Sequence, residues 1–242
     1  MRRYRIPFLT RRPMLVVGLL LLALGVTGCA LTVSPPGARE SASDARWHVW
    51  RFRFARADDG SVRSYLDNLV ADRVLFDVVA EQQSQILLWR FHRRWPDDLT
   101  GHQLSLMVYA PETTALAMSN MIARNPLVPE LIQQGYLVEW RIDPPSRDIA
   151  ASPAGLSDRH WGESVQREWP HFIMGASRFW VGLTRDAATA RQDMALHARY
   201  IAVEEDVDDF WYGRARHALL HHLNALFAYR PIEYYDGTPI RF

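Results

Sequence analysis

Arginine recurs at alternate positions in several short segments whose other positions are large and apolar. This alternation predicts half-buried β-strands at 47–55, 86–95, 102–110 and 136–142. If the aromatic side of each strand faces a core, the opposite side gathers a set of polar residues: Arg51, Arg53, Arg90, His92, Arg94, Ser105, Tyr109, Glu139 and Arg141. Guanidinium groups bind carboxylate and phosphate through paired hydrogen bonds, so this face is a candidate site for an anion.

The sequence leaves three interpretations of this polar face open. It could be a solvated or salt-bridged surface, partly covered by the acidic segment 204–209 or by helices at the C-terminal end. It could pack against the same face of a second copy in a homodimer. It could also bind a small anionic ligand between the sheet and the C-terminal helices, as an enzyme or a sensor would.

Histidines supply two further candidates. His217 and His221 are four residues apart on a predicted helix, so their rings point the same way. A zinc site needs more ligands, and the segment lacks the glutamate of zinc-protease helices, so a hydrated helix face is the alternative and no cofactor is expected. His222 falls on the predicted buried stripe. Segment 91–102, with two histidines, could act in acid–base chemistry or form a charged hairpin loop.

The N-terminal segment has the layout of a secretory signal. Five arginines lie within the first 12 residues, and the uncharged run 14–26 is too short to span a bilayer, which takes about 20 residues. The run ends in Val26, Thr27, Gly28 and Cys29, and Cys29 is the only cysteine of the chain. A plain signal peptide or a signal anchor with an incidental cysteine is the alternative.

These four residues resemble the lipobox of bacterial lipoproteins, in which small residues precede an obligatory cysteine. The resemblance covers the first 29 residues and implies cleavage after Gly28, with lipid attached to Cys29. Several acyl chains on one residue give stable membrane anchoring. Ala30 follows the cysteine where aspartate would imply retention in the inner membrane, so similarity to Gram-negative lipoproteins implies the outer membrane, facing the periplasm.

The charge balance excludes one class of partner. The chain has 28 basic and 27 acidic residues, and five arginines precede Cys29, so a chain starting at Cys29 carries 23 basic residues against 27 acidic ones. Nucleic-acid binding proteins carry a strongly basic patch, so a nucleic-acid partner is not expected.

The order of predicted elements gives the fold class. A helix at 62–83 separates the first two strands, and a second helix from Pro111, broken near Pro126 and ending at Gly135, separates the last two. The β-α-β-β-α-β order predicts an α+β, ferredoxin-like two-layer sandwich. The predicted boundaries are a signal peptide (1–28), a flexible tether (29–46), the sheet domain (47–142), a proline-rich linker (143–160) and a helical extension packed on the sheet domain (161–242).

The helical extension is expected to contain three helices. The first begins at Pro170, the second covers about 187–203, and the acidic segment 204–209 separates it from the third. The third helix has a predicted buried stripe of Trp211, Ala215, Leu219, Leu223 and Leu226, and a hairpin around Asp236 is expected to follow.

The favoured function is therefore a lipid-anchored lipoprotein of the cell envelope that acts by binding or assembly and not by catalysis. Its expected partners are the membrane, through the lipid, and an envelope protein or a second copy of itself. The alternative is an enzyme or sensor for a small anionic ligand.

Overall fold

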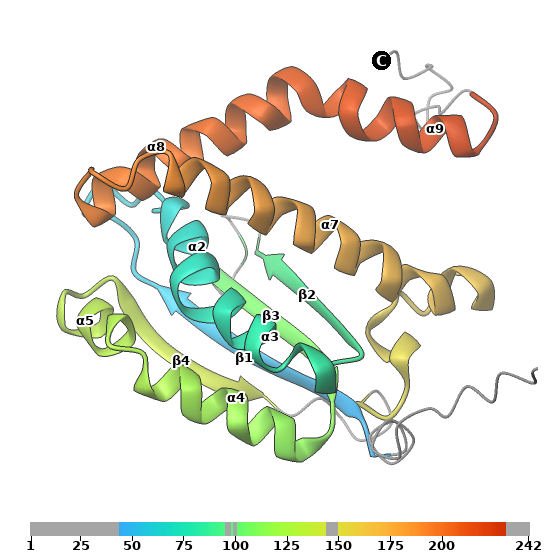
Figure 1. The fold of residues 1–242 in the computed structure, drawn as a ribbon, viewed down its shortest axis with the longest axis horizontal. Helices are drawn as coiled ribbons and strands as arrows, with labels where there is room; N and C mark the ends of the chain where they lie inside the picture. Colours follow the sequence, from blue (N-terminus) through green and yellow to red (C-terminus); the bar gives the residue numbers. More distant parts are fainter. Residues whose placement is uncertain (1–43, 95–97, 99–100, 144–149, 231–242) are drawn as a thin grey trace, which may run out of the picture. The chain divides into compact units, whose positions relative to one another are not determined.

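The structure is a computed structural model that describes residues 44–94, 98, 101–143 and 150–230 (Figure 1). The predicted signal peptide, Cys29, most of the tether and the hairpin around Asp236 lie outside the described residues. Within the described ranges, no helix is both long enough and apolar enough to cross a membrane.

The centre of the fold is a four-stranded antiparallel sheet in the order β2-β3-β1-β4. The strands are β1 (Arg46–Phe54), β2 (Leu88–Arg93), β3 (Gln103–Ala110) and β4 (Leu137–Asp143). All four predicted strands are confirmed, and β1 and β3 lie in the middle of the sheet, where their apolar residues are covered best.

Helices from two parts of the chain cover one face of the sheet (Figure 1). The first helical run contains α2 (Tyr65–Val70), a π-helical segment η1 (Ala71–Phe76), α3 (Asp77–Glu81) and a short 3-10 turn η2 (Gln83–Gln85), and the second contains α4 (Glu112–Arg124) and α5 (Leu127–Gln133). Asn125 ends α4, and its side chain accepts a hydrogen bond from the backbone N–H of Leu127 at 3.0 Å. The core between sheet and helices contains fully buried side chains from both layers, among them Trp50, Phe52, Leu66, Leu69, Leu104, Leu106, Met118 and Ile122.

Strand β4 contains an irregularity that strict alternation did not predict. Arg53 lies opposite Glu139, whereas the next residue, Phe54, lies opposite Leu137, so Val138 is an extra residue in β4. The bulge turns Leu137 into the core and leaves Val138 45% exposed. Strict alternation in the predicted strand 136–142 would place Val138 beside Trp140 on the core side, and that expectation is wrong.

The C-terminal part begins with a short 3-10 turn, η3 (Pro153–Leu156), and continues as α7 (Glu163–Thr189). Helix α7 starts seven residues before Pro170, so the prediction that Pro170 opens this helix is wrong. Proline has no N–H and cannot bond to the carbonyl of Gln166 four residues earlier. The hydroxyl of Ser157 donates to that carbonyl at 2.8 Å, which satisfies the acceptor and lets the helix continue through Pro170.

The last helical run is longer than predicted. It contains α8 (Leu196–Asp209), the π-helical segments η4 (Phe210–Arg214) and η5 (Arg216–His221), and α9 (His222–Leu226). The expected break at 204–209 is wrong because α8 includes this acidic segment, and the expected helix at 187–203 is wrong at its start because α7 ends at Thr189. In Figure 1 this run turns back after α7 and continues beyond α2.

The predicted buried stripe of the third helix is also wrong at several positions. Trp211 is 60% and Leu226 78% exposed, and His222 is exposed as well, whereas Ala215 is buried. Helix α8 packs on α2, but η4 and α9 lie further along the same helical run, where η4 contacts α8 and η5. An apolar stripe on a helix predicts burial only where another element covers it.

Candidate functional site

The sheet face opposite α2–α4 carries the predicted polar residues. Strand register places Arg51 between Arg141 and Ser105, places His92 beside Ser105, and places Glu139 beside Arg53. The prediction that these side chains share one face is confirmed by this register. We call this surface the arginine face. Its residues divide into an apolar end and a polar end.

The apolar end forms a small second core that the chain itself covers. It contains Trp47, Val49, Leu88, Met107 and Tyr109, with Leu156 and Met174 packed against it. The indole N–H of Trp47 donates to the carbonyls of Ser152 at 2.9 Å and Pro153 at 3.1 Å. The hydroxyl of Tyr109 donates to the carbonyl of Ala151 at 3.1 Å, and burial raises the pKa of Tyr109. The described part of the predicted linker is therefore packed on the sheet.

The polar end is a ladder of ion pairs between β1 and β4. Arg53 pairs with Glu139 at 3.0 Å, Glu139 with Arg141 at 3.5 Å, and Arg141 with Asp143 at 2.9 Å. Asp143 also pairs with Arg51. Such partly exposed pairs each contribute little to stability. They do occupy the guanidinium groups, and an anionic ligand would have to compete with two carboxylates of the protein.

Arg90 and His92 have a different environment from the ladder. Arg90 donates to the sulfur of Met107 at 3.1 Å and to the carbonyl of Leu156 at 3.5 Å. Among the described residues no carboxylate lies within ion-pair distance of Arg90, and burial lowers its pKa. Burial also lowers the pKa of His92, and the nearby Arg90, Arg94 and Arg51 lower it further.

The C-terminal helices lie mainly beside the arginine face and behind it, and Met174 of α7 packs on its apolar end. Helix α7 packs along the edge strand β2, where the backbone N–H of Phe91 donates to the hydroxyl of Ser177 at 3.0 Å. Val181 on α7 and Val203 on α8 belong to the main core, on the other side of the sheet. A ligand held between the arginine face and these helices stays a prediction.

A buried polar network that the sequence analysis missed lies where β2, α2 and α8 meet. Trp89, Phe91 and Arg93 occupy every second position of β2. Arg93 therefore lies on the same side of the sheet as the two aromatic rings, the side that faces the core. Its Nε donates to Asp67 at 2.8 Å, and its Nη2 donates to Glu204 at 2.6 Å. The guanidinium also lies 5.6 Å from the ring centre of Trp180 on α7. An arginine in the core register was the available signal, because a buried cation needs acidic partners.

The network continues on both sides of Arg93. The other carboxylate oxygen of Asp67 bonds to Nε2 of His102 at 3.0 Å, and both side chains are almost fully buried. Asn68 donates to Glu204 and accepts a hydrogen bond from Thr184 of α7 at 3.0 Å. His102 therefore lies inside the protein, and it does not belong to an exposed hairpin loop. The network connects β2, α2, α7, α8 and His102, the residue that precedes β3.

Burial and ion pairing both shift the pKa values of Arg93 and Glu204. Burial by itself would lower the pKa of Arg93, but the negative charges of Asp67 and Glu204 have the larger combined effect and raise this pKa. Burial raises the pKa of Glu204, while Arg93 acts in the opposite direction. Because each charged group bonds to another member, the arrangement holds α8 against β2 and α2.

The raised pKa of Glu204 predicts a pH dependence. The carboxyl group of Glu204 holds its proton more tightly in the folded chain than in the unfolded chain. The protonated Glu204 therefore stabilises the fold fully below the ordinary pKa of 4.5, and this contribution is lost as the pH rises through the folded-state pKa. We expect Glu204→Gln, which mimics the protonated acid, to gain in free energy of unfolding relative to the wild type as pH rises from about 4 to about 7. Urea denaturation at several pH values measures this difference, with the exposed Glu205→Gln as control. A difference that is constant with pH would contradict the assignment.

A second set of contacts fastens α8 to the first helical run. The hydroxyl of Tyr200, which is fully buried, donates to Asp72. Arg185 of α7 pairs with Asp72 at 3.5 Å and with Asp77 at 2.8 Å. Burial, followed by the hydrogen bond to Asp72, raises the pKa of Tyr200. Together with the Arg93 network, these contacts fix the position from which the rest of the last helical run extends.

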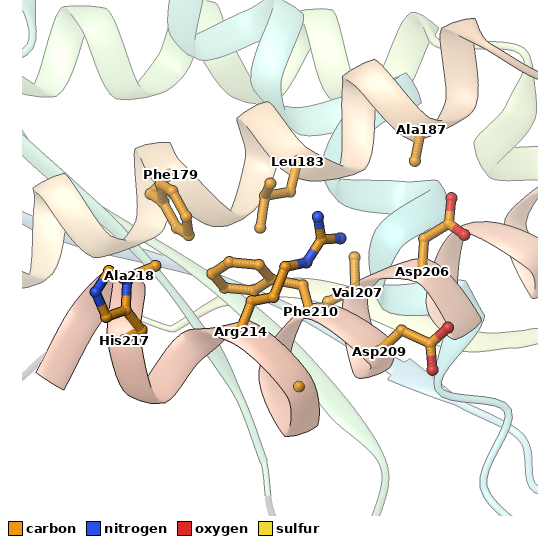
Figure 2. A pocket seen from close by; sticks show the side chains of 11 residues that line it. Phe179, Leu183, Ala187, Asp206, Val207, Asp209, Phe210, Arg214, His217 and Ala218 are labelled. Atoms are coloured by element: carbon orange, nitrogen blue, oxygen red, sulfur yellow. The ribbon is translucent and has the colours of Figure 1, made fainter. Parts of the chain in front are cut away.

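A groove of about 750 Å³ lies between α7 and the last helical run, and Figure 2 shows its lining. Phe179 and Leu183 of α7 face Val207 and Phe210 across it, with Arg214 and His217 further along. The rings of His217 and His221 stack at 5.0 Å. Within the described residues, no group of three or more histidine, cysteine, aspartate or glutamate side chains could hold a metal ion, so the predicted His217–His221 pair has no third ligand of this kind there.

Beyond the groove, the end of the last helical run exposes large apolar side chains. We call residues 210–230 the C-terminal arm. The most exposed are Trp211 (60%), Tyr212 (78%), Leu226 (78%), Phe227 (69%) and Tyr229 (60%). The arm contains three arginines and three histidines and no acidic residue. An apolar stripe on a helix predicts burial, so the exposure of these side chains is not predicted by the sequence.

Comparisons with known proteins give one structural match. No protein-family model and no curated protein sequence matches the chain. A solved structure of a dimeric ferredoxin-like protein from an uncultured marine organism is similar with a TM-score of 0.32 and 7% sequence identity, over 43% of this chain and 90% of that one. This similarity assigns the chain to no family.

Proposed function

We propose that the protein is a lipoprotein anchored through Cys29 to the outer membrane on its periplasmic side, and that it acts as a binding or assembly accessory without catalysis. We also infer that residues 46–143 form a ferredoxin-like domain, supported by the order of helices and strands and by the strand order β2-β3-β1-β4. The C-terminal arm then provides a second contact with the membrane surface.

The exposed aromatic residues of the arm carry this proposal. Large apolar side chains that are exposed along one segment are typical of surfaces that contact proteins or membranes. Tryptophan and tyrosine favour the membrane–water interface, where one end of the ring is apolar and the other meets water. Trp211, Tyr212 and Tyr229 are each at least 60% exposed.

The charge of the arm selects a lipid surface as its partner. Arg214, Arg216 and Arg230 lie in a segment without acids, whereas the rest of a chain starting at Cys29 has an excess of acidic residues. Anionic lipids attract each arginine near the surface by about 1 kcal/mol, and apolar side chains add to this when they enter the interface. An anchor at Cys29 would keep the arm close to such a surface.

The state of the arginine face supports binding over catalysis. Arg51, Arg53 and Arg141 already pair with Glu139 and Asp143. Arg93 pairs with both Asp67 and Glu204 where β2, α2 and α8 meet. These charged groups therefore hold strands and helices in place, whereas the exposed side chains of the arm have no such structural role in the described part of the chain.

Vesicle flotation of the unacylated mature chain tests the lipid contact. In a Cys29→Ser chain beginning at residue 29, we expect binding to vesicles containing phosphatidylglycerol and weak binding to pure phosphatidylcholine. Replacing both Trp211 and Phe227 with serine should weaken binding at least about tenfold, because two large apolar side chains no longer enter the interface. The control replaces Phe172 and Ile201, which are 47% and 46% exposed outside the arm. Equal losses in both variants, or no flotation with either lipid, would contradict the proposal.

A further inference from the structure

The two edges of the sheet differ in how they are protected. At the β2 edge, Ser177 of α7 accepts the hydrogen bond of an edge N–H. At the β4 edge, Val138 is 45% and Ile142 41% exposed, and the side chain of Arg141 is 55% exposed. Unprotected edge strands pair with other strands, so proteins cover them or use them.

The side chains of β4 are complementary to a second copy of the same strand. Trp140 lies on the helix side, stacked on Phe52 with ring centres 6.0 Å apart. Glu139 and Arg141 lie on the other side, one residue before and one residue after Trp140. An antiparallel pair related by a two-fold axis through Trp140 places each Glu139 opposite the partner's Arg141.

Neighbouring registers are unfavourable. In an antiparallel pair of identical strands, opposed residues must point to the same side of the sheet. A two-fold axis perpendicular to the sheet therefore passes through a residue, and the next possible registers have the axis at Glu139 or at Arg141. An axis at Arg141 would place the two Arg141 side chains opposite each other and Glu139 opposite the partner's Asp143. An axis at Glu139 would oppose two Glu139 side chains. Like charges directly opposite destabilise a sheet, and opposite charges stabilise it.

Apolar residues extend the same surface. In the register centred on Trp140, Ile142 lies two residues from the axis, and its side chain is 41% exposed in the single chain. Helices α4 and α5 lie at the β4 side of the sheet (Figure 1), and each carries an exposed apolar side chain, Leu116 (58%) and Ile132 (45%).

We propose that two copies of this chain pair through β4 around a two-fold axis at Trp140, which joins their sheets into one of eight strands. This pairing uses the sheet edge, unlike the face-to-face homodimer that the sequence left open. It involves neither Cys29 nor the C-terminal arm, so it stands or falls independently of membrane binding.

Disulfide cross-linking in the envelope tests the register directly. In a Cys29→Ser chain, Trp140→Cys places one cysteine on the two-fold axis, and opposed Cα atoms in antiparallel strands lie about 4.5–5.5 Å apart, within the range of a disulfide. We expect a cross-linked species of twice the chain mass. Ala198→Cys, at an exposed position of α8, is the control and should stay monomeric.

Charge exchange gives a second measurement that leaves Trp140 intact. Arg141→Glu should weaken dimerisation at least about tenfold in light scattering, because two like-charge pairs replace two ion pairs. Glu139→Arg combined with Arg141→Glu should restore much of the association, because the opposed charges again differ. Three outcomes would each overturn the proposal: a monomer at all concentrations, a dimer that Arg141→Glu leaves unchanged, or a Trp140→Cys chain that cross-links to a different envelope protein.

Discussion

Replacing Arg93 with alanine is expected to lower the free energy of unfolding by about 3 kcal/mol. The substitution leaves Asp67, whose side chain is 4% exposed, and Glu204, at 15%, without their shared cation. Removing one partner of a buried ion pair is costly because the remaining charges stay buried and unpaired. Chemical denaturation of both chains measures this difference.

The neighbouring residue supplies the matched control. The side chains of Arg93 and Arg94 are equally exposed, at 29% each. Arg94, however, pairs with Asp98, whose side chain is 28% exposed, whereas the partners of Arg93 are largely buried. Alanine at position 94 should therefore cost less than about 1 kcal/mol. If both substitutions cost the same, or if the Arg93 variant is as stable as the wild type, the network does not hold α8 on the sheet domain as we describe.

Replacing Trp47 with alanine is expected to cost about 3–4 kcal/mol of unfolding free energy and to release segment 150–157 from the sheet. Trp47 is 1% exposed in the second core and contacts Tyr109 at 5.4 Å between ring centres. Its indole N–H also holds the carbonyls of Ser152 and Pro153. Denaturation measures the stability, and limited proteolysis measures whether this segment becomes accessible.

A conservative change separates the ring of Trp47 from its hydrogen bonds. Trp47→Phe retains an aromatic ring but loses the indole N–H, so we expect a smaller loss, about 1–2 kcal/mol, with intermediate protease sensitivity. If Trp47→Ala left segment 150–157 fully resistant, this segment would not depend on the second core. The apolar end of the arginine face would then be covered for another reason.

Alternation was sufficient to predict the sheet. Trp50, Phe52 and Leu106 are buried, as their place on the apolar side of the predicted strands requires. The strand register also agrees with the predicted core side and polar side. Alternation did not predict the position of Val138, because a β-bulge shifts the two-residue period by one residue there. The bulge arises from the pairing of β4 with β1, which the sequence of β4 alone does not show. Pro170 misled the helix start because its compensating contact, from Ser157, comes from a different segment.

The polar sites were harder to predict because their partners are distant in sequence. The arginine face was assembled correctly from alternation, but Asp143, which pairs with Arg51 and Arg141, had been assigned to the linker. Glu204 lies 111 residues from Arg93, so local sequence showed only an acidic segment and suggested a break. The exposure of Trp211 likewise depends on where the last helical run ends relative to α2.

The intact mass of the protein extracted from the membranes of a Gram-negative host tests the proposed anchor most directly. We predict one main species that begins at Cys29, carries acyl chains on that residue, and is absent when Cys29 is replaced by serine. A membrane-extracted protein that keeps Met1, or one that is cleaved at another position and carries no lipid, would contradict the account.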